Sequence, residues 1–130
     1  MDTVRTNYEK WYEGETCCWG TEPAPFCDEL AALRPPRQEI KVLDIGCGEG
    51  KDAVYMARLG YDVTAFDLTE NGIRKTLKLA EKHNVTVKAF VDDINTFQLK
   101  ETFDIIYSTG TVQYLFEENK AGFFEKKQPI

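Results

Sequence analysis

The sequence predicts an α/β fold, a Rossmann-like open parallel sheet with helices on its faces. Two observations support this class. Short apolar runs alternate with helix-like segments from residue 40 to residue 108, and three alternating glycines follow the first apolar run. Strands that are separated by helices pair in parallel through right-handed crossovers. The chain has 130 residues, which predicts a single domain, because domains typically run to about 100–150 residues.

Residues 1–37 are predicted to form a helical cover that precedes the sheet. Apolar residues at helical spacing predict a first helix that ends by Gly14. The residues from 15 to 24 are polar and contain glycine and proline, so a loop is expected there. Helical spacing returns at Phe26 and predicts a second helix that stops before Pro35.

Residues 38–130 are predicted to form the Rossmann-like core. The expected elements are, in order, a strand over 40–45, a helix over 52–59, a strand over 62–66, a helix that Thr69 caps and that ends near 83–84, a strand over 85–91, a strand over 103–108 and a helical piece over 114–127.

Composition excludes several classes of partner. The chain has 16 basic and 22 acidic residues and a net charge of −6, which disfavours nucleic acid and anionic membrane surfaces. It contains no apolar run of membrane-spanning length, and its first residues lack a secretory signal pattern. The four cysteines have no Cys-x-x-Cys spacing and there is one histidine, so we expect no metal site, reduced thiols and a cytoplasmic location.

The segment from Val42 to Gly50 is the most informative motif, because an apolar strand runs directly into three alternating glycines. Glycine lets the backbone approach a ligand closely, so a nucleotide-like ligand is favoured over a turn that is glycine-rich by chance. A dinucleotide fingerprint needs a glycine where this chain has Lys51, and an NTPase phosphate loop needs a hydroxyl where it has Asp52. A nicotinamide cofactor and ATP hydrolysis are therefore both disfavoured.

Four segments in order resemble the motifs of the class I S-adenosylmethionine-dependent methyltransferases. They are 42–50, 64–68, 91–94 and 103–109. The resemblance covers about residues 38–116, and four ordered motifs are more specific than any one of them. With the segment 18–23 included, the chain is most similar to the small tellurite-resistance-type and thiopurine-type branch. The resemblance implies S-adenosylmethionine as cofactor and S-adenosylhomocysteine as product.

The candidate cofactor-binding residues follow from these motifs. They are Asp44, Gly46, Cys47, Gly48, Asp67, Leu68, Asp93, Ile94, Ser108 and Trp19. Asp67 ends the second strand, where a carboxylate can accept hydrogen bonds from ribose hydroxyls; a turn or cap role is the alternative. The resemblance places Asp93 at the adenine amine and the 103–109 motif, with Ser108, beside the methionine end.

The remaining candidates have competing structural interpretations. Leu68 and Ile94 are placed to hold the two faces of adenine, or belong to the core. Asp44 is expected near the methionine ammonium, or only holds the glycine turn. Trp19 is a candidate aromatic cover for the sulfonium or the substrate, with core packing as the alternative. Cys47 is expected to be a small apolar spacer in the turn, with a nucleophile as the less favoured alternative.

The resulting functional prediction is methyl transfer to a small-molecule acceptor, such as a thiol or another soft nucleophile, with no catalytic residue assigned. The alternative is a non-catalytic S-adenosylmethionine-binding fragment or regulatory subunit. The resemblance implies further C-terminal strands that this chain lacks. The strand over 103–108 would then expose an apolar edge, which predicts a homodimer through that edge or through the C-terminal segment.

Overall fold

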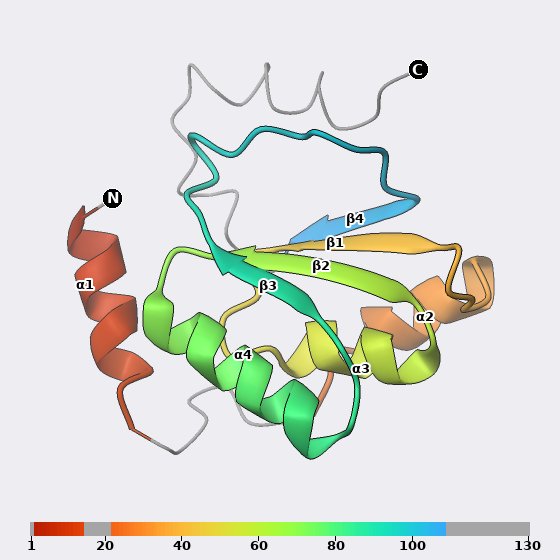
Figure 1. Ribbon diagram of the computed structural model, residues 1–130, viewed down its shortest axis with the longest axis horizontal. Helices are drawn as coiled ribbons and strands as arrows, with labels where there is room; N and C mark the ends of the chain where they lie inside the picture. The colour runs from red at the N-terminus through yellow and green to blue at the C-terminus, as the bar shows by residue number, and fades with distance from the viewer. Residues whose placement is uncertain (1, 15–21, 109–130) are drawn as a thin grey trace.

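The computed structural model describes residues 2–14 and 22–108. The elements run in the order α1 (Asp2–Trp11), α2 (Phe26–Leu33), β1 (Lys41–Ile45), α3 (Lys51–Leu59), β2 (Asp62–Asp67), α4 (Glu70–Lys82), β3 (Lys88–Val91) and β4 (Ile105–Ser108) (Figure 1). Within the described ranges, no helix has the length and apolar character that crossing a membrane requires.

The four strands form one parallel sheet in the order β3-β2-β1-β4. The chain moves outward from β1 to β3 and then returns to place β4 on the other side of β1. Ile45, the last residue of β1, is in register with Phe66 on one side and with Ser108 on the other. The carboxyl ends of all four strands therefore share one edge. Such an edge, at the point where the strand order reverses, is where α/β sheets bind ligands.

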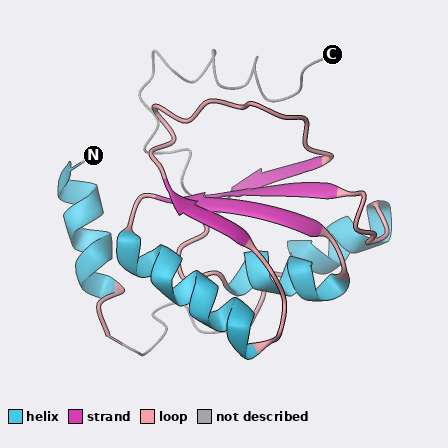
Figure 2. Cartoon of the chain, viewed as in Figure 1, coloured by secondary structure: helices cyan, strands magenta, loops and turns pink. Residues whose placement is uncertain are grey.

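The two faces of the sheet are covered differently. Helices α2, α3 and α4 lie on one face, whereas the segment that links β3 to β4 crosses the other (Figure 2). Helix α1 stands beside the start of α4 (Figure 1). The helix-side core includes Val42, Met56, Tyr61 and Val63, all nearly inaccessible to solvent. A smaller core on the opposite face contains Leu43, Ile45, Phe66, Ile94 and Phe103. β1 is buried on both faces, and its residues Val42, Leu43 and Ile45 are apolar, as expected for a central parallel strand.

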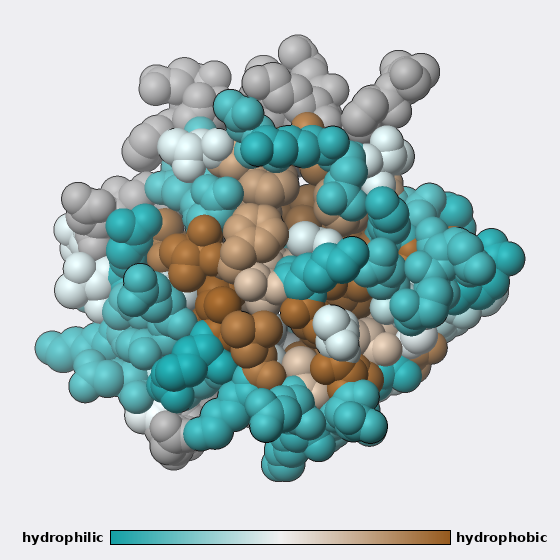
Figure 3. Space-filling view, in the orientation of Figure 1, coloured by the Kyte–Doolittle hydropathy of each residue, from teal (hydrophilic) through white to brown (hydrophobic). Residues whose placement is uncertain are grey.

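The outer strand β3 carries exposed apolar residues, Phe90 and Val91. Apolar side chains gather on the face seen in Figure 3, the face on which β3 lies nearest the viewer. The ring of Phe90 stacks on that of Phe66, with centroids 5.9 Å apart. This edge strand is thus joined to the core through its aromatic side chain.

The predicted fold class is confirmed, and two strand boundaries differ by more than one residue. We expected the third strand to begin at residue 85, but β3 begins at Lys88. The N–H of Val85 donates to the carbonyl of Ala80 at 3.0 Å, so this backbone completes the end of α4 and cannot pair with β2. The fourth strand was expected from residue 103, but β4 begins at Ile105. The helical piece expected over 114–127 lies outside the described residues.

Candidate cofactor-binding site

The glycine turn, residues 46–50, connects the end of β1 to the start of α3. Gly46, Gly48 and Gly50 have φ angles of 73°, 57° and 93°, in the left-handed region that favours glycine. The N–H groups of Gly46 and Cys47 both donate to the carbonyl of Phe66, at 2.8 and 3.0 Å. A Cβ on Gly48 would lie 3.1 Å from the hydroxyl oxygen of Tyr12. The turn is therefore tied to the end of β2, and its positive φ angles and the approach of Tyr12 explain the glycines.

Asp67, at the end of β2, is hydrogen-bonded to the glycine turn. Its Oδ1 accepts from the N–H of Gly48 at 2.9 Å. Its Oδ2 accepts from the N–H of Thr69 at 3.1 Å and from the Thr69 hydroxyl at 2.6 Å. Burial raises the pKa of Asp67, these hydrogen bonds lower it, and the negative charge of Glu9 raises it further. A carboxylate has about four acceptor positions, so three filled positions leave room for one ligand hydroxyl.

Asp44, in the central strand, is only 1% exposed. Its Oδ2 accepts from the hydroxyl of Tyr107 at 3.0 Å, which fixes the carboxyl group between β1 and β4. Its Oδ1 is buried and has no hydrogen-bond partner in the structure. Burial raises the pKa of Asp44 to about 8; the Tyr107 hydrogen bond opposes this rise, and the nearby Asp52 and Asp67 add to it. A cation or an N–H donor at this position would satisfy a group that is otherwise costly to bury.

Ser108 supplies a second buried polar atom without a partner among the described residues. Its Oγ has no hydrogen bond within that part of the chain, and its Cα is in register with that of Ile45, next to Asp44. Buried polar groups are nearly always satisfied, so two such atoms on neighbouring strand ends indicate a place for a polar ligand. These atoms and the glycine turn fit the amino-acid end of the cofactor that the sequence predicts.

Asp93 lies at the same edge, in a turn that follows β3. The N–H of Asp92 donates to the carbonyl of Asp67 at 3.0 Å, which joins this turn to the end of β2. The Oδ1 of Asp93 accepts from the N–H and the side-chain amide of Asn95, at 2.9 and 3.1 Å. Asp93 therefore has a structural role in shaping the turn as well as a position near Asp67.

The two apolar candidates differ in their surroundings. Ile94 is buried and belongs to the core cluster that contains Phe66 and Phe103, which favours its core-packing interpretation. Leu68 is half-buried, directly after Asp67. Of these two residues, Leu68 has the more accessible side chain at the strand ends.

Cys47 has a thiol that lies 3.7 Å from the hydroxyl oxygen of Thr76. Burial raises the pKa of this thiol well above its ordinary value, and Asp44 and Asp67 raise it further. Because the thiolate is the reactive form, Cys47 is unsuited to act as a nucleophile and fills space in the turn. Trp19, the remaining candidate, lies outside the described residues.

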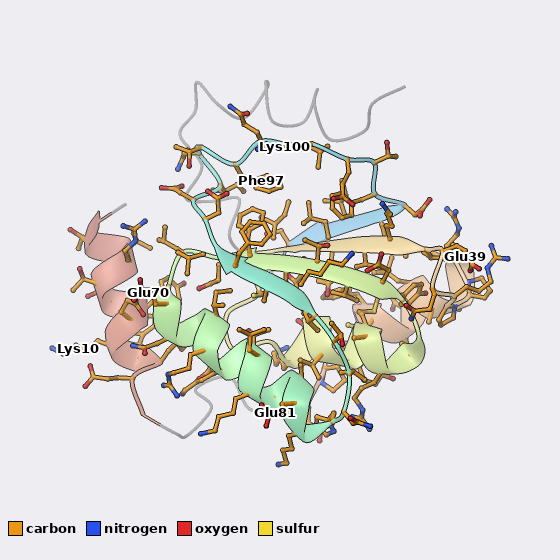
Figure 4. The ribbon with its side chains drawn as sticks, in the orientation of Figure 1. Lys10, Glu39, Glu70, Glu81, Phe97 and Lys100 are labelled. Carbon is orange, nitrogen blue, oxygen red and sulfur yellow. The ribbon has the colours of Figure 1, made fainter. Side chains whose placement is uncertain are left out.

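Three side chains near the site were not among the sequence candidates, namely Glu9, Tyr12 and Tyr107. Both oxygens of Glu9 accept hydrogen bonds from backbone N–H groups at the start of α4, from Glu70 at 3.0 Å and from Asn71 at 2.9 Å. In Figure 4, Glu70 lies at the end of α4 that is next to α1. Tyr12 falls within the first predicted helix, whose spacing does not show that Tyr12 meets Gly48, and no local signal marked Glu9.

The described residues offer no cluster of three or more histidine, cysteine or acidic side chains that could hold a metal ion. The site is thus an acidic, glycine-lined edge. Backbone N–H groups and hydroxyls hold Asp44 and Asp67. Its chemistry suits an organic ligand that carries a positive charge and hydroxyl groups.

Comparison with known proteins identifies the family of this chain and several of its relatives. Residues 29–128 match the family model described as tellurite resistance protein TehB. A protein of Haemophilus influenzae (strain 10810), named as a probable S-adenosyl-L-methionine-dependent methyltransferase TehB, is 38% identical over 88 residues. That alignment covers 68% of this chain and 31% of the relative.

Solved structures show the same relationship. The crystal structure of TehB from Haemophilus influenzae has a TM-score of 0.73 and 29% identity, over 95% of this chain and 40% of that one. A TehB-like S-adenosylmethionine-dependent methyltransferase from Corynebacterium glutamicum has a TM-score of 0.70 and 26% identity, over 98% of this chain and 68% of that one. The chain spans about a third of the length of the curated relative that it matches.

Proposed function

Because the chain belongs to the TehB family, whose named relatives are S-adenosylmethionine-dependent methyltransferases, we propose that it binds S-adenosylmethionine and transfers a methyl group to a small-molecule acceptor. The observation that carries this proposal is the position of Asp67. Its carboxylate meets the N–H of Gly48 at 2.9 Å, where the glycine turn and the end of β2 come together. This arrangement places one carboxylate where it can accept from a ribose hydroxyl beside a turn that admits close approach.

The chain's own residues would mainly bind and orient S-adenosylmethionine. Asp67 would accept from a ribose hydroxyl, and the half-buried Leu68 would contact the adenine next to it. Asp44 and Ser108 would satisfy the ammonium group at the other end of the ligand. When bound, S-adenosylmethionine supplies a methyl group that is activated by a positively charged sulfur. Orientation of the reactants alone can lower a barrier by several kcal/mol.

We assign the acceptor to small, soft nucleophiles such as thiols. Thiols ionise near neutral pH and need little help from a base. The single histidine, His83, is at the C-terminal end of α4, whereas the start of that helix meets the site. An assay of S-adenosylhomocysteine formation with a panel of thiols tests this assignment. Tight cofactor binding without turnover on any acceptor would favour the alternative of a non-catalytic binding subunit.

The binding proposal is tested by calorimetric titration with S-adenosylhomocysteine. Asp67→Asn replaces the carboxylate with a group of the same shape and should weaken binding by about tenfold or more, since hydrogen bonds to charged groups contribute about 1.5–3 kcal/mol. Asp62→Asn is the matched control, because Asp62 lies at the opposite end of the same strand. Equal affinities for both variants would contradict the assignment of Asp67.

We also propose that two copies associate through the outer edge of β4. Within the described residues β4 pairs with β1 alone, and an unpaired strand edge is a template for pairing with a second chain. Sedimentation at low protein concentration should show a dimer, and a stable monomer would contradict this proposal.

A cytoplasmic location is proposed from the cysteines. Cys27 and Cys47 are free thiols in the structure, and reduced cysteines are typical of cytoplasmic proteins. Cell fractionation tests this location.

A further inference from the structure

A buried ion pair joins the glycine turn to α4. The Nζ of Lys75 lies 2.8 Å from the Oε2 of Glu49, and the two side chains are 6% and 3% exposed. Charged residues are almost never this buried unless they are paired. Replacing such a pair with apolar side chains is often neutral or stabilising, so stability alone is a weak reason for it.

The position of Glu49 allows the ion pair to fix the conformation of the glycine turn. Glu49 stands between Gly48 and Gly50, whose φ angles are both positive. Glycines at these positions let the turn reach its shape but do not hold it there, because glycine has the widest choice of backbone conformations. Glu49 carries the only side chain in residues 48–50, and Lys75 of α4 pairs with it.

The same face of α4 makes further contacts with the turn. The hydroxyl of Thr76 donates to the carbonyl of Gly48 at 3.1 Å. A Cβ on Gly72 would lie 2.8 Å from that same carbonyl oxygen. Gly72, Lys75 and Thr76 are spaced so that they share one side of a helix. The turn is therefore pressed against α4, and Lys75 contributes the charged contact.

We propose that Lys75 is a positioning residue for the cofactor, which acts through Glu49 to hold residues 46–50 in the conformation that accepts the ligand. This inference rests on the proposed function, because the ligand at the turn is S-adenosylmethionine or its product. Lys75 lies on α4 and pairs with Glu49 of the turn. Its effect on binding is therefore indirect, through the backbone conformation of residues 46–50.

The test uses a double variant that removes both charges together. Glu49→Gln with Lys75→Met leaves no unpaired buried charge, which either single change would leave. The matched control is Lys41→Met with Glu101→Gln, an exposed ion pair of 3.1 Å at the opposite end of β1. Two quantities are measured for each protein, namely the Kd for S-adenosylhomocysteine and the hydrogen-exchange protection of the Gly48 and Gly50 amides without ligand.

The double variant should stay folded, with protected amides in β1 and β2, but its Gly48 and Gly50 amides should exchange faster than in the wild type. Its Kd for S-adenosylhomocysteine should rise by about tenfold or more, because the apparent Kd increases as the fraction of molecules with a binding-competent turn falls. The control pair should change neither quantity. A purely structural role would lower the melting temperature and leave the Kd unchanged well below it.

Two results would overturn the inference. One is wild-type affinity in the double variant, and the other is unchanged protection of Gly48 and Gly50. Loss of the proposed function would look different, since the wild-type protein itself would then fail to bind S-adenosylhomocysteine. The exchange measurement on the free protein would still show whether Lys75 holds the turn.

Discussion

Asp44 is the residue whose ionisation should most affect stability. Its carboxyl group is buried in the central strand, and one of its oxygens has no partner. Burial raises its pKa from 3.8 to about 8. The folded chain therefore holds a proton on Asp44 at pH values where the unfolded chain has released it.

Stability should fall as the pH rises through this range. Between about pH 4 and pH 8 the unfolded state binds fewer protons at Asp44 than the folded state, so the free energy of unfolding decreases as the pH rises. The contribution is complete below the unfolded pKa and is lost as the pH passes the folded one. Urea unfolding at several pH values measures it. Asp44→Asn should reduce this dependence to the part that the raised pKa of Asp67 contributes. The same dependence of stability on pH in the variant and the wild type would contradict the assignment.

Gly50 is a second residue with a direct structural test. It precedes α3 with a φ of 93°, and a Cβ there would lie 2.7 Å from the hydroxyl oxygen and 2.8 Å from the Cα of Thr76. Gly60 also has a positive φ, but a Cβ there would meet its nearest neighbour, in Pro36, at 3.7 Å. The two positions share backbone strain and differ in crowding.

Gly50→Ala should therefore destabilise the protein more than Gly60→Ala. We expect about 1–2 kcal/mol for the left-handed conformation in both, and about 1–3 kcal/mol more at Gly50 for the collision with α4. Chemical denaturation of the two variants gives the difference. Equal losses would mean that the turn and α4 are not in close contact.

At the scale of elements, α1 is held at the start of α4 by one carboxylate. Glu9 accepts from the N–H groups of Glu70 and Asn71, and its own carbonyl accepts from the Asn71 side-chain amide at 3.0 Å. Carboxylates are stabilising at helix N-termini because the N–H groups there lack partners within the helix. Glu9 thus fixes the helix that brings Tyr12 over Gly48.

Glu9→Ala should loosen α1 and leave the sheet intact. Loss of a capping carboxylate costs about 1 kcal/mol, so amide exchange should accelerate in α1 and at the start of α4, with β1 and β2 unchanged. Glu13→Ala, at an exposed position just after α1, is the matched control. If both variants left exchange in α1 at the wild-type level, Glu9 would not be its anchor.

The elements and their order could be predicted from sequence because each depends on local spacing. The apolar run of β1, the glycines after it and the Thr69 cap are all readable within a few positions. The structure places Thr69 as predicted, with its side chain accepting from the N–H of Gly72. The starts of β3 and β4 were less predictable, because apolar residues beside a strand can pack in the core without joining the sheet.

The site was only partly predictable, because some of its contacts join residues that lie far apart in the sequence. Asp44 and Asp67 were identified because strand ends meet at one edge of a parallel sheet. Glu9 meets Asn71 across 62 positions of the sequence, and Lys75 meets Glu49 across 26. Such contacts depend on how α1 and α4 pack. No local pattern encodes that packing.

At the scale of the whole molecule, the two ends of the sheet have different electrostatics. At the amino ends of the strands, acidic groups are paired with basic side chains, as in Lys88 with Asp62 at 3.4 Å and Lys41 with Glu101 at 3.1 Å. At the carboxyl ends, Asp44 and Asp67 are held by neutral hydroxyl and N–H donors. The pKa values of both carboxyl groups are raised, and a cationic ligand bound beside them would favour their ionised forms.

The most direct test of this account is a titration of the isotope-labelled chain with S-adenosylhomocysteine, followed by the backbone amide signals in NMR. Binding at the proposed site should shift the amides of residues 46–50, Leu68 and Asp93 in a saturable way. The amide signals of Lys41 and Asp62, at the opposite end of the sheet, should not shift. Saturable shifts centred away from the carboxyl edge, or no shifts at millimolar ligand with a folded protein, would contradict the central claim that this edge is the cofactor site.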